Sequence, residues 1–210
     1  MMLRMNSMQR RHLLRSGLAL PLSSMAVSSL AVSAMTVWTL TDARASDTIA
    51  ATLRAGGVVV ALRHALAPGT FDPPEFTLGE CSTQRNLNDE GRAQAQRLGQ
   101  WFQRQGLKPA QVRSSPWCRC MDTANGAFGA AQAWAALGSP RGSSEQTNDE
   151  SLGQMRAALA AVAPGRFEVW VTHAFVQQAL TGQSTAAAEG LGLRSGPGGA
   201  VQLVGRLTVA

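Results

Sequence analysis

The sequence is poor in charge, because only 15% of its 210 residues are charged while 45% are hydrophobic. This composition excludes a disordered acidic or basic tail protein, which has too few apolar residues to form a core. One globular domain is the expected organisation, and no internal repeat divides it. Basic residues after position 45 are scattered singly, without a stripe of interleaved aromatics, so the formal net charge of +6 does not indicate a nucleic-acid partner.

Most of the excess positive charge lies in the first 45 residues, which hold a single acidic residue. The run Gln9–Arg15 contains paired arginines, and a weakly apolar run from Gly17 to Leu40 follows it. Ala43-Arg44-Ala45 then forms an A-x-A cleavage site of the kind that a signal peptidase uses. We therefore predict that residues 1–45 are a twin-arginine signal peptide and that residues 46–210 are a periplasmic or secreted protein, which meets the membrane only during export.

Two alternatives to export stay open. The segment Leu18–Leu40 is long enough to cross a bilayer as a helix, which would make it an anchor. Pro21, several serines and the cleavage site oppose that interpretation. The other alternative is a cytoplasmic protein whose start is misread.

Cysteine is scarce as well, with Cys81, Cys118 and Cys120 the only three in the chain. Disulfides persist in oxidising compartments, so export favours a disulfide between Cys81 and either Cys118 or Cys120. Free thiols are one alternative. A metal site is another, but no histidine stands at the usual zinc spacing from Cys118-x-Cys120.

Strand and helix patterns alternate along the mature chain, which predicts an α/β fold with a mostly parallel central sheet and helices on both faces. The predicted strands are Val58–Leu62, Val112–Ser115 and Phe167–Thr172, with two closing strands at Ala200–Val204 and Arg206–Val209. The predicted helices are residues 47–55, 89–105, 116–124 and 152–162 and a short segment ending near Gly182. Two stretches without any period, residues 65–86 and 138–148, are expected to be loops.

Histidine is rarer still, since the mature chain has only His64 and His173. Each directly follows an apolar strand, and the carboxyl ends of parallel strands meet at one edge of a sheet. Arg63 precedes the first histidine, and Arg119 stands at the start of the helix after the second strand. Two guanidiniums and two imidazoles in one crevice indicate an anion site, because the arginine fork matches phosphate oxygens.

Four segments in order resemble the motifs of the histidine phosphatase superfamily, whose fold is phosphoglycerate mutase-like. They are Val60–Ala65 (VALRHA), Asn86–Ala95 (NLNDEGRAQA), Ser114–Ala124 (SSPWCRCMDTA) and Val171–His173 (VTH). The resemblance covers about residues 58–182 and departs from the family pattern at the signature glycine, which is Ala65 here.

This resemblance implies a phosphatase that hydrolyses a small phosphomonoester through a phosphohistidine, without a metal or other cofactor. The predicted signal peptide would make it an exported one. By position, His64 would be the nucleophile that accepts the phosphoryl group. Arg63, Arg119 and His173 would bind the phosphate and stabilise the charge of the phosphoryl group in transfer.

The general acid for the leaving group does not follow from the resemblance, because branches of the family supply it from different places. Ala174 follows His173, so the acid that some branches carry directly after the histidine is absent. Two loop carboxylates are candidates: Glu145, by its spacing after Arg119, and Asp72, in the long loop after His64. Each is also compatible with a solvated loop charge or a turn residue.

A second class of function stays open. A phosphate-binding or sensing protein could keep the two arginines and two histidines in the same pocket while its catalysis is impaired. A mutase would share the pocket, but an exported protein would not meet the usual pathway substrate. The natural substrate and the oligomeric state do not follow from these motifs.

Overall fold

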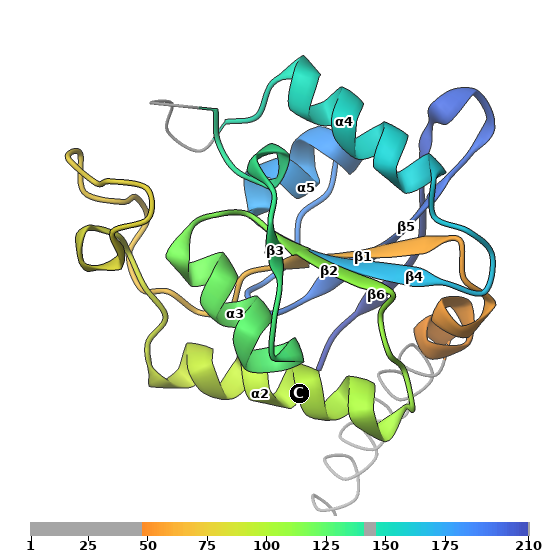
Figure 1. Ribbon diagram of the computed structural model, residues 1–210, viewed down its shortest axis with the longest axis horizontal. Helices are drawn as coiled ribbons and strands as arrows, with labels where there is room; N and C mark the ends of the chain where they lie inside the picture. The colour runs from red at the N-terminus through yellow and green to blue at the C-terminus, as the bar shows by residue number, and fades with distance from the viewer. Residues whose placement is uncertain (1–47, 141–145, 210) are drawn as a thin grey trace, which may run out of the picture.

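The computed structural model describes residues 48–140 and 146–209, and Figure 1 shows their arrangement. The predicted signal peptide and Glu145 lie outside the described residues. In the described part of the chain, six strands form one sheet in the order β3-β2-β4-β1-β5-β6. Their bounds are β1 Val58–Arg63, β2 Gln111–Ser114, β3 Gln132–Ala133, β4 Phe167–Thr172, β5 Gly190–Ser195 and β6 Val201–Leu207.

The sheet is mostly parallel, as predicted. Strand β4 pairs in parallel with both β1 and β2, and β2 pairs in parallel with β3. The antiparallel strands β5 and β6 extend the other edge from β1. Apolar runs such as Val58–Leu62 form buried strands because helices cover both faces of the sheet.

The helices lie in two layers, one on each face of the sheet (Figure 1). Helices α4 (Asp149–Ala160) and α5 (Ala174–Thr181) pack on one face around a core that includes Met155 and Trp170. Helices α2 (Asp89–Arg104) and α3 (Cys118–Phe128) cover the other face, in the same core as the helical residues 48–55. In the part of the chain that the structure describes, none of the helices is both long and apolar enough to cross a membrane.

The sheet differs from the prediction at its antiparallel edge. The two predicted closing strands, 200–204 and 206–209, are one strand, β6, and the prediction missed β5 altogether. Glycines interrupt the apolar pattern of β5, so the pattern did not predict a strand there. Close packing against neighbouring side chains favours glycine at these positions. A Cβ at Gly190 would lie 2.8 Å from the side chains of Val60 and Leu62, and one at Gly192 would lie 2.7 Å from Ile49.

Candidate active site

The two histidines meet because the strands before them are in register. Arg63 of β1 pairs with Thr172 of β4, so His64 and His173 leave the sheet side by side. The amide N–H of His64 donates to the carbonyl of Thr172 at 2.9 Å, which continues the ladder by one residue. Their rings lie edge to face, with centroids 5.5 Å apart.

The His64 ring has a fixed orientation and is uncharged. Its side chain is buried, and Nδ1 lies 2.8 Å from the carbonyl oxygen of Ala65, which can only accept. Nδ1 therefore carries the proton and Nε2 carries the lone pair. Burial lowers the pKa of His64 to about 3, and the charges of Arg119, Arg85 and Arg63 act in the same direction, against the hydrogen bond to Ala65. A neutral imidazole with an available Nε2 is the form that can act as a nucleophile.

His173 is held through both ring nitrogens. Nε2 lies 2.8 Å from Ser115 Oγ, and Nδ1 lies 3.4 Å from Arg119 Nη2. Because a guanidinium only donates, Nδ1 accepts, and the ring proton sits on Nε2 facing the serine. Burial lowers the pKa of His173 well below its ordinary value, and the charge of Arg119 adds to this effect. Phe175 stacks on the ring with a centroid distance of 5.0 Å.

A cavity of about 330 Å³ opens at the carboxyl ends of β1 and β4. His64 and His173 line it together with two guanidinium groups, those of Arg63 and Arg85. The rest of the lining is mostly small or apolar and comes from the start of the long loop, the start of α5 and the segment before β5: Leu66, Ala67, Pro68, Gly69, Thr70, Ala174, Phe175 and Ala187. Two cations beside two neutral imidazoles form a site suited to a small anion.

Arg63 is fixed by a chain of hydrogen bonds that returns to its own strand. Its Nη1 donates to the carbonyl of Thr185 at 2.9 Å. The side-chain oxygen of Gln177, a buried residue of α5, accepts from both the amide and the hydroxyl of Thr185, and its Nε2 donates to the carbonyl of Ala61. The guanidinium is therefore oriented before any ligand arrives, which lowers the entropic cost of binding one.

Arg119 is paired with Asp72 from the long loop. Both carboxylate oxygens lie 2.9 Å from Nη1, and the Asp72 carboxylate also accepts from Trp117 Nε1 at 3.1 Å and from the Arg85 amide at 2.9 Å. Arg119 is 1% exposed and does not line the cavity. Asp72 does not line it either.

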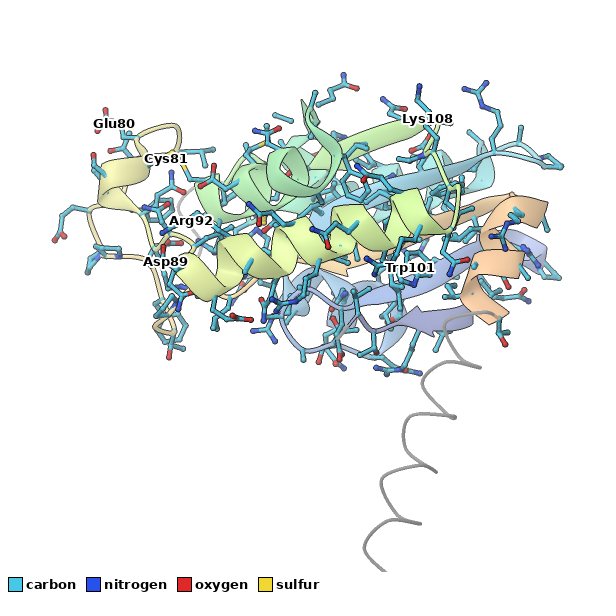
Figure 2. All side chains as sticks on the ribbon, turned by 90° about the horizontal axis from the view of Figure 1, so that it is seen from below. Glu80, Cys81, Asp89, Arg92, Trp101 and Lys108 are labelled. Carbon is cyan, nitrogen blue, oxygen red and sulfur yellow. A yellow bond between two sulfur atoms is a disulfide. The ribbon has the colours of Figure 1, made fainter. Side chains whose placement is uncertain are left out.

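A disulfide holds the long loop against α3. Cys81 bonds to Cys118, the first residue of α3, with a Cα–Cα distance of 5.6 Å, so the predicted disulfide is confirmed and its partner is Cys118. Figure 2 shows Cys81 near the end of the molecule where α2 begins at Asp89, opposite the end that carries Lys108. The amide of Cys118 also donates to the side chain of Gln84 at 3.1 Å.

Cys120 is the free cysteine, and it is buried beside His173. Burial raises the pKa of its thiol to about 12, so it stays protonated and unreactive at neutral pH. Among residues 48–140 and 146–209, no group of three or more histidine, cysteine or acidic side chains is placed to hold a metal ion.

The structure brings together four of the six residues that the sequence singled out, Arg63, His64, Arg119 and His173. Asp72 lies at Arg119 rather than over the cavity, and its role as an acid stays a prediction, as does that of Glu145. Sequence reasoning did not commit to Arg85 and missed the supporting residues Ser115 and Gln177. The rule that found the histidines also applies to Ser115, because it directly follows β2 as they follow β1 and β4.

Comparison with known proteins gives one family match. The family described as "Histidine phosphatase superfamily (branch 1)" matches residues 78–190, a range that includes Arg119 and His173 and begins after His64. No curated protein matches the chain.

Solved structures show similar folds at low identity. The protein histidine phosphatase SixA, solved as a complex with tungstate, is 16% identical with a TM-score of 0.50, and the match covers 72% of this chain and 96% of SixA. TTHB049 from Thermus thermophilus is 19% identical with a TM-score of 0.49, over 72% of this chain and 99% of its own. Rv3214 from Mycobacterium tuberculosis is also 19% identical with a TM-score of 0.49, over 72% of this chain and 96% of its own.

Proposed function

The chain belongs to branch 1 of the histidine phosphatase superfamily, and from this premise we propose that it is an exported phosphomonoesterase that uses His64 as its nucleophile. The observation that carries the proposal is the state of His64. Its Nδ1 is committed to the carbonyl of Ala65, its ring is neutral, and it lines a cavity that also contains Arg63 and Arg85.

In the first step, the lone pair of His64 Nε2 attacks phosphorus, and an N–P bond forms as the ester P–O bond breaks. The Nδ1 proton stays on the ring, and its hydrogen bond to the Ala65 carbonyl stabilises the positive charge that the ring gains. The leaving oxygen takes a proton from a general acid, for which Asp72 and Glu145 are the candidates. Arg63 and Arg85 bind the phosphoryl oxygens and stabilise their charge during transfer.

In the second step, a water oxygen attacks phosphorus and the N–P bond breaks. The electron pair returns to Nε2, and the proton of the water goes to the carboxylate that served as acid. His173 supports both steps as a neutral neighbour of Arg119, while its own ring proton stays directed at Ser115. No step requires a metal.

Export is part of the proposal. The Cys81–Cys118 disulfide is of the kind that persists in oxidising compartments, which supports a periplasmic or secreted location. If the protein is exported by the twin-arginine route, its N-terminus after processing is Ser46, and replacing Arg10 and Arg11 by lysine retains the precursor in the cytoplasm. An unprocessed N-terminus on the exported protein would contradict this part.

The test of the activity is hydrolysis of an aryl phosphate by the purified protein, from acidic to neutral pH and with a chelator present. We expect chelator-resistant turnover that His64→Ala abolishes and that Lys108→Ala, at the opposite end of the molecule, leaves unchanged (Figure 2). Protein quenched in alkali during turnover should carry a phosphoryl group on His64.

A second candidate function, phosphate binding without catalysis, is distinguished by the same experiment. Its supporting observation is that Arg119, an expected phosphate ligand, is already paired with Asp72. A folded protein that binds phosphate but shows no turnover, with or without His64, would favour this second function.

A further inference from the structure

The pairing of Asp72 with Arg119 places a protein anion on a group that the family motif assigns to phosphate. The carboxylate is 8% exposed and the guanidinium 1% exposed, so this ion pair is removed from solvent. Among the described residues, the carboxylate accepts hydrogen bonds from three partners, which are Arg119 Nη1, Trp117 Nε1 and the Arg85 amide. Hydrogen bonds between charged groups at about 2.9 Å are the strong ones in proteins.

Arg119 remains directed toward the site although it is covered. Its Nη2 lies 3.4 Å from Nδ1 of His173, which lines the cavity. Its Nε is buried and has no hydrogen-bond partner among the described residues. Arg119 lies beside the imidazole of His173, but the cavity does not reach its guanidinium. Asp72 is the anion that is paired with this guanidinium.

We infer that Asp72 is an internal competitor of the substrate, whose carboxylate must be displaced from Arg119 before the phosphoryl group can engage this arginine. The inference rests on the proposed function, because it assumes that the ligand of the cavity is a phosphoryl group. Two anions at one buried guanidinium repel each other, so a phosphoryl group that approaches Arg119 weakens the existing ion pair and favours release of the Asp72 carboxylate. Asp72 therefore sets the affinity of the site and selects for ligands that carry enough charge to replace it.

The Cys81–Cys118 disulfide keeps the Asp72 carboxylate close to Arg119. Cys81 lies on the same loop as Asp72, and its partner Cys118 precedes Arg119 in the chain. The hydrogen bond from the Cys118 amide to Gln84 ties the loop to α3 a second time. A tethered anion acts at a high effective concentration, so the carboxylate returns whenever a ligand leaves. Reducing the disulfide should weaken this tether and the competition with it.

The test measures binding without catalysis, by titrating the oxidised full-length protein with tungstate, a tetrahedral oxyanion like phosphate. Asp72→Asn keeps the shape of the side chain but removes its charge, and we expect it to bind tungstate at least about tenfold more tightly than the wild type. Glu189→Gln is the matched control. The Glu189 carboxylate accepts a hydrogen bond from the amide of Ala186, which precedes the lining residue Ala187, and it does not pair with Arg119. Glu189→Gln therefore measures the long-range effect of removing one negative charge near the cavity.

A second readout follows the displacement itself. The Trp117 indole donates to Asp72, so the arrival of tungstate should change the tryptophan fluorescence of the wild type, and Trp117→Phe should lose that change. Trp117→Phe also removes one of the bonds that hold the carboxylate, and it should bind tungstate more tightly than the wild type. This variant tests the inference independently if Asp72→Asn does not fold.

The inference is overturned if Asp72→Asn binds tungstate no more tightly than Glu189→Gln does, or if no variant binds it at all. Its failure is separate from that of the proposed function. If the protein hydrolyses an aryl phosphate but Asp72→Asn does not bind tungstate more tightly, the role of Asp72 as a competitor is wrong and the proposed activity stands. If Asp72→Asn binds tungstate more tightly but the protein shows no turnover, the proposed activity is wrong and the competitor role stands.

Discussion

His64 and His173 face each other edge to face, with ring centroids 5.5 Å apart and an interplanar angle of 69°. The pairing of Arg63 with Thr172 in neighbouring parallel strands causes this arrangement, since each histidine is the next residue along its strand. Both rings are buried, and the cations around them disfavour protonation of either one. The site therefore holds two neutral imidazoles among guanidiniums, and its behaviour should depend on pH in a definite direction.

The first prediction concerns stability in acid. Folding lowers the pKa of both histidines, to about 3 for His64, so the unfolded chain takes up protons below about pH 6.5 while the folded protein does not. The free energy of unfolding should then fall as pH drops from about 6.5 towards 3, by up to about 1.4 kcal/mol per pH unit from His64, and His173 should add to the fall in the same direction. Denaturant unfolding at several pH values measures this, and His64→Asn should make the dependence shallower. An unchanged slope in that variant would contradict the prediction.

Much of this site could be predicted from the sequence because its rules are local. An apolar run predicts a buried strand, the residue after it lies at the carboxyl edge, and parallel pairing brings such residues together. His64 and His173 follow from these steps, as does Arg119 at the start of a helix. The same reasoning failed at β5, where the glycines that packing requires break the apolar pattern.

The position of Asp72 could not be predicted, because the loop that carries it has no periodicity. The shape of the loop depends on contacts between residues far apart in the chain. These include the Cys81–Cys118 disulfide and the hydrogen bond that the Trp117 indole donates to Asp72. A loop without a repeating pattern contains no local signal for such contacts. The sequence identified Asp72 as a candidate but not Arg119 as its partner.

The second prediction concerns the disulfide, which closes a sequence separation of 37 residues. Chain-entropy arguments give such a link about 3–4 kcal/mol of stability, so Cys81→Ala with Cys118→Ala should lower the free energy of unfolding by about that amount. Cys120→Ala is the control, because it leaves the disulfide in place and its stability should still respond to a reductant. Thiol titration of the unfolded, unreduced protein should find only the Cys120 thiol, and a count of three thiols would contradict the disulfide.

The third prediction concerns the contact between α2 and α3. A Cβ at Gly99 would lie 2.3 Å from the backbone oxygen of Ala127, so Gly99→Ala must push the two helices apart. We expect Gly99→Ala to lower the free energy of unfolding by about 1–3 kcal/mol, although alanine has the higher helix propensity. Gly153 is the matched control, since it is also helical but, outside its own helix turn, none of the described residues has an atom within 4 Å of its ideal Cβ. Gly153→Ala should raise the free energy of unfolding by up to about 1 kcal/mol. Equal effects of the two changes on thermal unfolding would contradict the packing argument.

The fourth prediction concerns the guanidinium of Arg63, whose orientation is fixed by Thr185. Lysine keeps the positive charge but loses the planar fork, so Arg63→Lys should lower kcat/KM for an aryl phosphate by about a hundredfold. Arg92→Lys is the control, because Arg92 forms an exposed ion pair with Asp89 on α2, and this change should leave turnover intact. Full activity in Arg63→Lys would show that the charge alone suffices and that the fork has no part in transfer.

The last prediction concerns the general acid. An acid matters most for a poor leaving group, since an alkoxide needs a proton as it departs and an aryl oxide hardly does. Asp72→Asn and Glu145→Gln should therefore be compared on an alkyl and an aryl phosphate. The variant that lacks the acid should lose about a hundredfold or more in kcat on the alkyl ester and little on the aryl ester.

If Asp72 acts only as the competitor at Arg119, its removal should instead lower KM for both esters and leave the ratio of their kcat values unchanged. If neither variant shows a loss specific to the alkyl ester, both predicted acids are wrong, because a carboxylate that protonates the leaving oxygen cannot be removed without that loss.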